Sequence, residues 1–338
     1  MPRLSLMDQG MQVRQINNLT LNRYRQLFGQ PYKTDEYDAR LIASFLQQPL
    51  DCKNVNYQEN QLIPVNQMNI DIKKLARHQM DLTKGLIRFK NKLKKMILSY
   101  LPELLDVYDD IFSPNCLALI ALGKTPVQLN KMKLNKLAQV KSKNGSRGIG
   151  LQKAQELKTA LREIYSDLFD SNSVNAKIAR NYALNIYEIH QQIKDLDQEL
   201  ASLLRIHPQG SNLLSVPGIG IKIAARIIGE TVDVKRFKTL DKYSAYSGVV
   251  CLRNDSGRSK RARNTKQSNR ILKDSYMKAA LTSIRINSAS KTYYDKKIQA
   301  GHGHLSALKC LAHQISKVVY KLMKTNSCYQ ESFYQKAA

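Results

Sequence analysis

Two long segments of the chain repeat apolar residues at intervals of three and four positions, with polar residues between them. This spacing is typical of amphipathic helices. Because a long insertion separates the segments, the pattern predicts an antiparallel coiled coil or arms that pair between subunits, although a helical-bundle core would show the same periodicity. Within the insertion, Thr125 and Pro126 predict the start of a shorter helix. The first stripe, interrupted by Gln79, is Ile72, Leu75, Leu82, Leu86, Phe89, Leu93, Met96 and Tyr100. The second stripe is Ala179, Tyr182, Ile186, Ile189, Ile193, Leu196, Leu200 and Leu203.

The N-terminal region has the mixed pattern of an α/β unit. Met11–Ile16 alternates polar and apolar residues, as a short strand does. Leu19–Phe28 predicts a helix, and KTDEYDARLIASF, Lys33–Phe45, predicts another with Thr34 as its N-cap. Residues 49–68 contain prolines and several asparagines, which predict a linker.

Charge narrows the possible functions. The 338 residues carry a formal net charge of +27. Each phosphate that Lys or Arg neutralises releases a counterion, so this excess favours a polyanion such as nucleic acid as the partner. A membrane surface would attract the same charge, but no stretch approaches the roughly 18 apolar residues of a membrane span. The scattered cysteines lack CxxC spacing, which argues against a zinc ribbon or a disulfide framework and favours a reducing cytoplasm.

Residues Leu213–Gly229, LLSVPGIGIKIAARIIG, predict a helix-hairpin-helix. Gly218 and Gly220 would let the backbone approach a phosphate, and the start of the second helix offers unpaired N–H groups. Lys222 and Arg226 add positive charge to the same turn. Such a hairpin holds the backbone of a duplex and reads no bases. A plain helical turn in a hydrophobic core would have a similar sequence, because the flanking residues are strongly apolar.

The stretch Tyr246–Lys273 is densely basic. From Arg253 to Lys273 it has eight Lys or Arg residues and one acid, Asp255. Ser256 and Gly257 predict an exposed turn, and a hydroxyl in such a positive field could attack a phosphodiester. The alternative is a solvated basic loop whose serine starts a turn. The nucleic-acid contacts predicted here are Arg253, Arg258, Lys260, Arg261, Arg263 and Lys266.

Asp35 and Asp38 lie three positions apart at the start of a predicted helix. Their Cβ atoms would be about 5–6 Å apart, so the two carboxylates share a face. Hard cations such as Mg²⁺ prefer oxygen ligands of this kind. Acids in a first helical turn are also favoured by the helix dipole alone. The pair is therefore either half of a metal site or an ordinary helix start.

Taken in order, these three stretches resemble insertion-sequence transposases of the IS110/IS1111 family, whose catalytic set is DEDD plus serine. The pilin-gene inverting recombinase is similar to this family. KTDEYDARLIA resembles the family's Lys-Thr-Asp-x-x-Asp-Ala-Arg segment. SVPGIG followed by RFKTLDKYSAYSGVV resembles the start of its C-terminal domain, and SGRSKRARNTKQSN followed by LKDSYMKAA continues the match. The long insertion is similar to that of the IS1111 branch.

The resemblance covers nearly the whole chain and implies a mainly α fold with four regions. Residues 1–60 would be the C-terminal part of a truncated α/β RNase H-like (RuvC-type) domain. Residues 65–207 would form long coiled-coil helices with an insertion. Residues 208–325 would be a helical C-terminal transposase domain containing the helix-hairpin-helix, and residues 326–338 a tail.

The resemblance also implies an activity, that of a DNA transposase or site-specific recombinase. Asp35 and Asp38 would be ligands for Mg²⁺ or Mn²⁺. Ser256 would attack a DNA phosphate and form a phosphoserine intermediate. The implied partners are DNA at the element ends and target, a non-coding guide RNA from the element, and further copies of the chain in a dimer or tetramer. The implied location is the bacterial cytoplasm, at the nucleoid.

The N-terminus departs from the family pattern. The family has an Asp and a Glu on strands ahead of the paired aspartates, whereas here 34 residues precede Asp35 and Asp8 is their only acid. We therefore expect an N-terminally truncated domain whose partner carboxylates are missing. This leaves two alternatives to an active transposase. One is a catalytically inactive remnant that still binds DNA or RNA, and the other is a basic RNA-binding scaffold.

Overall fold

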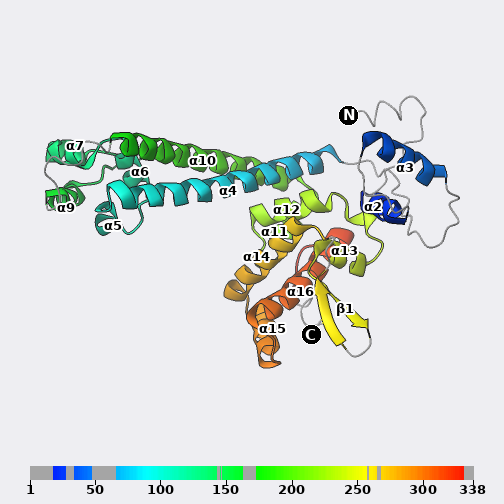
Figure 1. The fold of residues 1–338 in the computed structure, drawn as a ribbon. Coiled ribbons are helices and arrows are strands. Elements are labelled where there is room, and N and C mark those ends of the chain that lie inside the picture. Colours follow the sequence, from blue (N-terminus) through cyan, green and yellow to red (C-terminus); the bar gives the residue numbers. More distant parts are fainter. Residues whose placement is uncertain are drawn as a thin grey trace. The chain divides into compact units, whose positions relative to one another are not determined.

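The computed structural model describes residues 18–27, 34–47, 66–142, 145, 147–162, 173–256, 259–264 and 268–330. Helices dominate these residues, and the only sheet among them is one pair of short strands. The mainly α prediction is confirmed for this part of the chain. The chain divides into two compact units, 1–65 and 66–338, and Figure 1 shows the helices of each. Each unit has its own hydrophobic core.

In the N-terminal unit, helix α2 (Asn18–Leu27) packs against helix α3 (Asp35–Gln47). Their apolar faces meet in a small core. The rings of Tyr24 and Phe45 are in edge contact, with 5.1 Å between their centroids, and Leu41 is buried beside them. This packing holds the first turn of α3, with its three acidic residues, at the surface of the pair.

The helices of this unit agree with the sequence patterns. Thr34 Oγ1 accepts the N–H of Tyr37 at 3.3 Å, so the predicted N-cap is confirmed. The predicted strand Met11–Ile16 and most of the predicted linker, residues 49–68, lie outside the described residues. The RNase H-like character of this unit stays a prediction.

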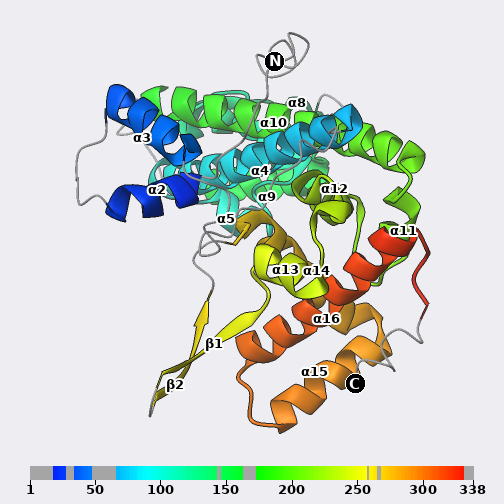
Figure 2. The same ribbon diagram turned by 90° about the vertical axis from the view of Figure 1, so that its right-hand side faces the viewer.

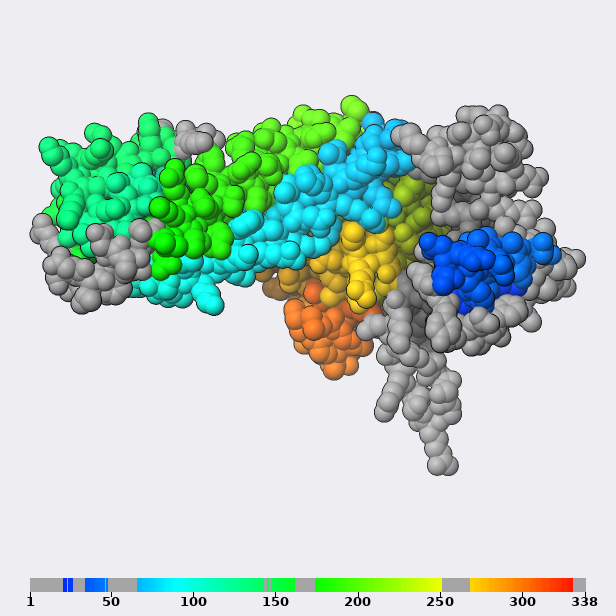
Figure 3. Space-filling model, turned by 45° about the horizontal axis from the view of Figure 1, so that its top comes forward, coloured from blue at the N-terminus to red at the C-terminus, as the bar shows by residue number. Residues whose placement is uncertain are grey.

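Two 34-residue helices, α4 (Gln67–Tyr100) and α10 (Ser173–Ile206), form an arm. They run antiparallel, because Ile72 near the start of α4 shares a core with Leu204 near the end of α10. Figure 1 and Figure 3 show the two helices side by side along the arm. The two apolar stripes therefore pair with each other within one chain. The buried positions of α4 are Ile72, Ala76, Gln79, Leu86, Leu93, Ile97 and Tyr100.

Five short helices close the far end of the arm, and together with the ends of α4 and α10 they enclose a second core. Thr125 caps the third of them by accepting the N–H of Gln128 at 3.3 Å, and Pro126 is its first residue. This predicted helix start is confirmed. The five helices are α5 (Leu104–Val107), α6 (Pro114–Ile120), α7 (Pro126–Lys131), α8 (Leu134–Ala138) and α9 (Leu151–Arg162).

The near end of the arm shares one core with the C-terminal helices, so the two regions that the sequence patterns separate at residue 208 form one compact unit. Tyr243 and Tyr276 are fully buried in this core, with their hydroxyl groups hydrogen-bonded to each other. No helix in the described part of the chain combines the length and apolarity of a membrane span. The C-terminal elements are α11 (Gly210–Leu214), α12 (Ile221–Thr231), the 3₁₀ turn η2 (Val234–Arg236), α13 (Leu240–Ser247), α14 (Arg270–Ile286), α15 (Ser288–Gln299) and α16 (His304–Thr325).

A β-hairpin between α13 and α14 contains Ser256, where the sequence pattern allowed either an exposed turn or a solvated basic loop. Strand β1 (Cys251–Ser256) pairs antiparallel with β2 (Ser259–Asn264), from Cys251 opposite Asn264 to Ser256 opposite Ser259. Figure 2 shows the hairpin projecting from the helices. The strands CLRNDS and SKRARN lack alternating apolar residues, so the usual sequence signal of a half-buried strand is absent.

Candidate nucleic-acid interface

The predicted helix-hairpin-helix lies between α11 and α12, and packing explains its first glycine. Gly218 has a φ of +89°, in the left-handed region that favours glycine. A Cβ at this position would lie 2.3 Å from the carbonyl oxygen of Ala279 in α14. Ile219, the next residue, is buried. Gly218 therefore holds the turn against α14, and its lack of a side chain requires no phosphate nearby.

The second glycine of the turn faces open space. Gly220 is the N-cap of α12 with a φ of −93°, and no atom lies within 4 Å of the position that a Cβ would take. An open groove of about 590 Å³ beside it is lined in part by Lys222 and Lys278. The first N–H groups of a helix lack partners within the helix and carry partial positive charge. The groove therefore combines three features suited to a phosphate: accessible backbone, a helix N-terminus and two lysines.

Lys222 already has an acidic neighbour in this groove. Its Nζ lies 2.9 Å from Oδ2 of Asp197, which belongs to α10 of the arm. Both side chains remain partly exposed, so solvent weakens the pair. A nucleic-acid phosphate could replace Asp197 as the partner of Lys222.

Arg226, the fourth residue predicted to contact nucleic acid at this turn, is buried instead. Only 8% of it is exposed. Its guanidinium donates to Oε1 of Gln79 at 3.2 Å and lies 3.7 Å from Oδ2 of Asp274. Burial lowers its pKa, while the nearby carboxylates of Asp274 and Asp197 oppose that effect. Arg226 joins α12 to α4 and α14, and this position does not support a contact with a phosphate at the surface.

The same contacts explain the polar interruption in the first apolar stripe. Gln79 is almost fully buried between the arm and α12. Its Nε2 donates to Oδ1 of Asp197 at 3.3 Å while its Oε1 accepts from Arg226. A buried amide with partners on both sides avoids the cost of an unsatisfied polar group. Gln79 therefore fixes where α10 and α12 meet α4.

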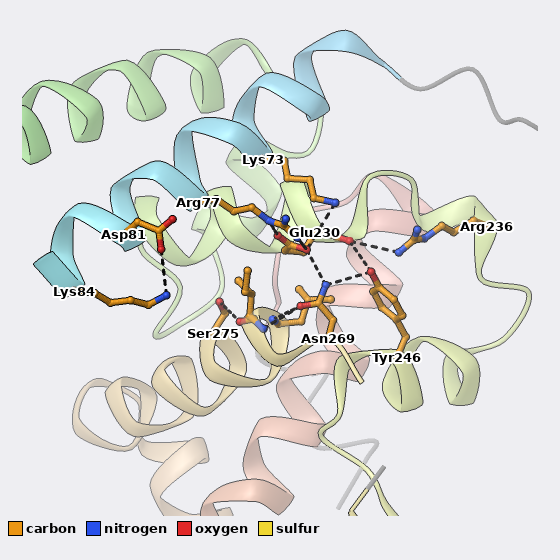
Figure 4. A network of polar contacts seen from close by, with 11 residues as sticks. Lys73, Arg77, Asp81, Lys84, Glu230, Arg236, Tyr246, Asn269 and Ser275 are labelled. Carbon is orange, nitrogen blue, oxygen red and sulfur yellow. Dashed lines mark hydrogen bonds and ion pairs between the residues drawn. The ribbon is translucent and has the colours of Figure 1, made fainter. Parts of the chain in front are cut away.

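A second buried network centres on Glu230, near the end of α12 (Figure 4). Its side chain is 3% exposed. The carboxylate accepts Nε and a terminal nitrogen of Arg77 at 2.6 and 3.0 Å, and Nδ2 of Asn269 at 2.7 Å. Lys73 Nζ lies 3.8 Å away. Burial would raise the pKa of the Glu230 carboxyl, but the hydrogen bonds from Arg77 and Asn269 outweigh it and hold the pKa below its ordinary value.

Asn269 links this carboxylate to the base of the β-hairpin. Its Oδ1 caps α14 by accepting the N–H groups of Ile271 and Leu272 at 3.0 and 3.1 Å. Its own N–H donates to the carbonyl of Tyr246 at 2.7 Å, which ties the two chain segments at the base together. Neither Glu230 nor Asn269 is among the residues that the sequence pattern marks as functional. A lone acid in the apolar helix IKIAARIIGET is a signal that could have found Glu230, because a buried carboxylate needs partners.

The backbone register places Ser256 at the last paired position of β1, opposite Ser259. Positions alternate between two sets along an antiparallel ladder, and paired residues belong to the same set. Arg261 pairs with Asn254, and Arg263 pairs with Leu252. Since Asn254 and Leu252 lie two and four positions before Ser256, both arginines fall in the same set as Ser256. Arg253 and Lys260 fall in the other set. Gly257, Arg258 and Lys266 lie outside the described residues.

Asp35 and Asp38 do not form a metal site by themselves. Asp35 is exposed in the first turn of α3, and Asp38 forms an ion pair with Arg25 of α2. No third carboxylate, histidine or cysteine joins them within the described residues. A two-metal site needs oxygen ligands on both sides of its ions. Here the described residues supply two carboxylates, and that of Asp38 is already paired with Arg25, so they do not fit a two-metal site.

A turn at the far end of the arm resembles the α11–α12 turn in sequence and packing, although its left-handed glycine is the second one, Gly150, with a φ of +88°. A Cβ on Gly148 would lie 2.3 Å from the carbonyl oxygen of Ala138, Ile149 is buried, and Gly150 has open space around it just before α9. The stretch from Lys124 to Lys158 has one acid. The repeated Gly-Ile-Gly at 148–150 is the signal in the sequence that could have found this turn. Exposed cations around this turn are Lys131, Lys133, Lys136, Lys141, Arg147 and Lys153.

Two family models of transposases match parts of this chain. A family model described as Transposase IS116/IS110/IS902 family matches residues 210–295, which include the α11–α12 turn, the β-hairpin and α14. A second model, described as a transposase, matches residues 3–102, which include α2, α3 and α4. In its N-terminal and C-terminal parts the chain is therefore similar to insertion-element transposases of the IS116/IS110/IS902 family.

Individual relatives agree with the family models. The 43.6 kDa protein of insertion element IS110 from Streptomyces coelicolor is 23% identical over 332 residues, which is 96% of this chain and 78% of the relative. The 42 kDa protein of IS900 from Mycobacterium paratuberculosis is 24% identical over 309 residues, covering 90% of this chain and 75% of the relative. The 44.8 kDa protein of IS116 from Streptomyces clavuligerus is 22% identical over 320 residues, with 94% and 78% covered.

Proposed function

We propose that this chain is the DNA recombinase of an insertion element, and that it cuts and joins DNA strands through Ser256. The observation that carries the proposal is the place of Ser256 in the chain. It ends β1 in a hairpin rich in Lys and Arg, inside the stretch that matches the transposase family. Transposases act on DNA, and the net charge of +27 suits a phosphate backbone. The family matches do not favour the alternative of an inactive binding remnant.

The proposed reaction is a transfer of a phosphoryl group to and from serine. The Ser256 oxygen forms a bond to the DNA phosphorus, and the bond from phosphorus to one sugar oxygen breaks. The proton lost by the serine hydroxyl balances the one gained by the leaving sugar hydroxyl. Attack by another DNA hydroxyl then reverses the step and releases the serine. Arg261 and Arg263, in the same register set as Ser256, would stabilise the negative charge that develops on the phosphate.

The remaining partners are predictions carried over from the family resemblance. Asp35 and Asp38 would contribute to a site for Mg²⁺ or Mn²⁺ once further oxygen ligands join them and Arg25 releases Asp38. The helix start at Gly220 with Lys222 would hold the backbone of the bound DNA. A guide RNA, assembly into a dimer or tetramer, and a place at the bacterial nucleoid complete the proposal.

The test compares two serines at the same end of the hairpin. Ser256→Ala and Ser259→Ala remove the same hydroxyl from positions that face each other in the register. Full-length protein is incubated with labelled DNA carrying the element ends, and protein covalently joined to DNA is measured after denaturation. We expect no covalent product with Ser256→Ala, unchanged DNA binding for both variants, and normal product with Ser259→Ala. Recombination of a supercoiled donor by Ser256→Ala would overturn the assignment of the nucleophile.

A further inference from the structure

The β-hairpin depends on its base for its position. Within the described part of the chain, its substantial contacts are those between its own two strands. The chain enters the hairpin just after α13 and leaves it at Asn269, the N-cap of α14. The hydrogen bond from Asn269 N–H to the Tyr246 carbonyl joins these two segments. The direction in which the hairpin projects is therefore set where the two segments meet.

Glu230 connects this base to the arm. Its carboxylate accepts hydrogen bonds from Asn269 at the base and from Arg77 of α4. Its backbone carbonyl accepts a hydrogen bond from the hydroxyl of Tyr246 at 3.3 Å. Asn269 Nδ2 also lies 3.2 Å from the Tyr246 hydroxyl. A single buried carboxylate thus holds an arm residue and a residue at the hairpin base at once (Figure 4).

We propose that Glu230 and Arg77 are positioning residues, which orient the hairpin that carries Ser256 by tying its base to helix α4 of the arm. This inference rests on the proposed function, because it takes Ser256 as the group to be oriented. A displacement of about 1 Å in a reacting group can cost about 100-fold in rate, so an anchor at the base of a projecting hairpin would have a large effect on the reaction. The arm would then act on strand transfer through its contact with Glu230.

Helix α4 offers a matched control for Arg77. The side chains of Arg77 and Lys84 are 51% and 61% exposed, and each is paired with an acid. The partner of Lys84 is Asp81, which is on the same helix and does not reach the hairpin base. Replacing either cation with alanine removes one positive charge and one ion pair from α4. Only the Arg77 variant loses a contact to Glu230.

The experiment uses full-length protein and four variants: Arg77→Ala, Arg77→Lys, Glu230→Gln and Lys84→Ala. The rate of the covalent serine–DNA step is measured in a single turnover at saturating DNA, alongside DNA affinity and the thermal unfolding midpoint. We expect Arg77→Ala and Glu230→Gln to lower the rate about 10-fold or more while affinity stays within about 3-fold. Arg77→Lys should recover most of the rate, and Lys84→Ala should stay within about 2-fold of the parent.

A pH profile separates positioning from simple support of the fold. The charged groups facing Glu230 are Lys73 and Arg77 from α4 and Arg236 from η2, and the titratable Tyr246 faces it from α13. In the parent protein the lowered pKa of Glu230 keeps its carboxylate charged at neutral pH, and the charge is lost only as the pH falls through that lowered value. Burial raises the pKa of the Glu230 carboxyl, and without Arg77 fewer hydrogen bonds oppose this effect. In Arg77→Ala the acid limb of the plot of rate against pH should therefore move to higher pH.

The possible results distinguish this inference from the proposed function. Covalent product with Ser256→Ala would refute the proposed function itself. If Ser256→Ala is inactive but Arg77→Ala and Glu230→Gln react at the parent rate, only the positioning role is refuted. The positioning role would also be refuted if Arg77→Ala and Lys84→Ala lost rate equally, in proportion to their loss of DNA affinity and thermal stability, and the acid limb did not shift.

Discussion

Replacing the two glycines of the α11–α12 turn one at a time separates packing from nucleic-acid contact. Gly218→Ala places a methyl group at a φ of +89° and 2.3 Å from the Ala279 carbonyl oxygen. A left-handed backbone costs an L residue about 1–2 kcal/mol, and forcing a methyl group into a packed contact costs about 1–3 kcal/mol more. The free energy of unfolding should therefore fall by roughly 2–5 kcal/mol. Gly220→Ala meets no atom within 4 Å at a φ of −93°, so its folded backbone is unstrained.

Two measurements on each variant test this reasoning. A stability change of 1 kcal/mol moves the unfolding midpoint of a large domain by about 2–4 °C, so we expect Gly218→Ala to melt at least about 4 °C lower in circular dichroism. Gly220→Ala should melt within about 2 °C of the parent, because the loss at an N-cap and the gain from a stiffer unfolded chain nearly cancel. Its affinity for duplex DNA should fall, since the methyl group blocks the approach of a phosphate to the backbone. Parent-like DNA affinity of Gly220→Ala would refute the phosphate site, and a parent-like melting temperature of Gly218→Ala would refute the close contact with α14.

Two further predictions concern pH and salt. Burial lowers the pKa of His207, whose Nδ1 accepts the Gln209 N–H at 3.1 Å while Nε2 donates to Asn69 at 2.7 Å, so the folded state needs the neutral ring. Below pH 6.5 the unfolded chain therefore binds more protons than the folded one, so the melting temperature should fall as the pH drops towards the lowered pKa of His207. The fall should be smaller in His207→Gln. Equal slopes of melting temperature against pH in the two proteins would contradict this. Reversing Arg147 and Lys141, both exposed at the arm tip, to Glu should flatten the plot of log affinity for DNA against log salt by about 1 or more, without changing thermal stability. An unchanged slope would show that the arm tip does not contact phosphates.

The sequence predicted the arm because its energetics are local. A helix that buries one face against a partner must repeat apolar residues every three or four positions, and both stripes do so from Ile72 to Leu203. The helix starts at Thr34 and Thr125 were readable for the same reason, since a cap bonds within its own first turn. The role of Gln79 was not readable, because its partners Asp197 and Arg226 lie more than a hundred residues away.

The hairpin and its anchor could not be predicted from local patterns. β1 and β2 satisfy their hydrogen bonds with each other, and neither strand needs the apolar alternation that marks a strand against a core. The pattern of the glycine-rich turn predicts that Arg226 adds its charge to that of Lys222, but the structure buries Arg226. Its position one turn further into an apolar helix was the better guide, since a charge there is buried and must be paired. The same reasoning applies to Glu230.

A buried carboxylate in a chain this basic is better explained by geometry than by stability. Removing an ion pair from water costs several kcal/mol per ion, and apolar residues of similar size often stabilise a core as well or better. An apolar side chain at position 230 could fill the same space but could not fix the orientation of its neighbours. Glu230 accepts hydrogen bonds in set directions from Arg77 and Asn269, which lie on separate segments. If the hairpin must present Ser256 to a phosphate at one angle, directional bonds at its base offset their cost. Replacing both partners, Glu230→Leu with Arg77→Leu, should then keep the fold, measured by circular dichroism, while losing strand transfer.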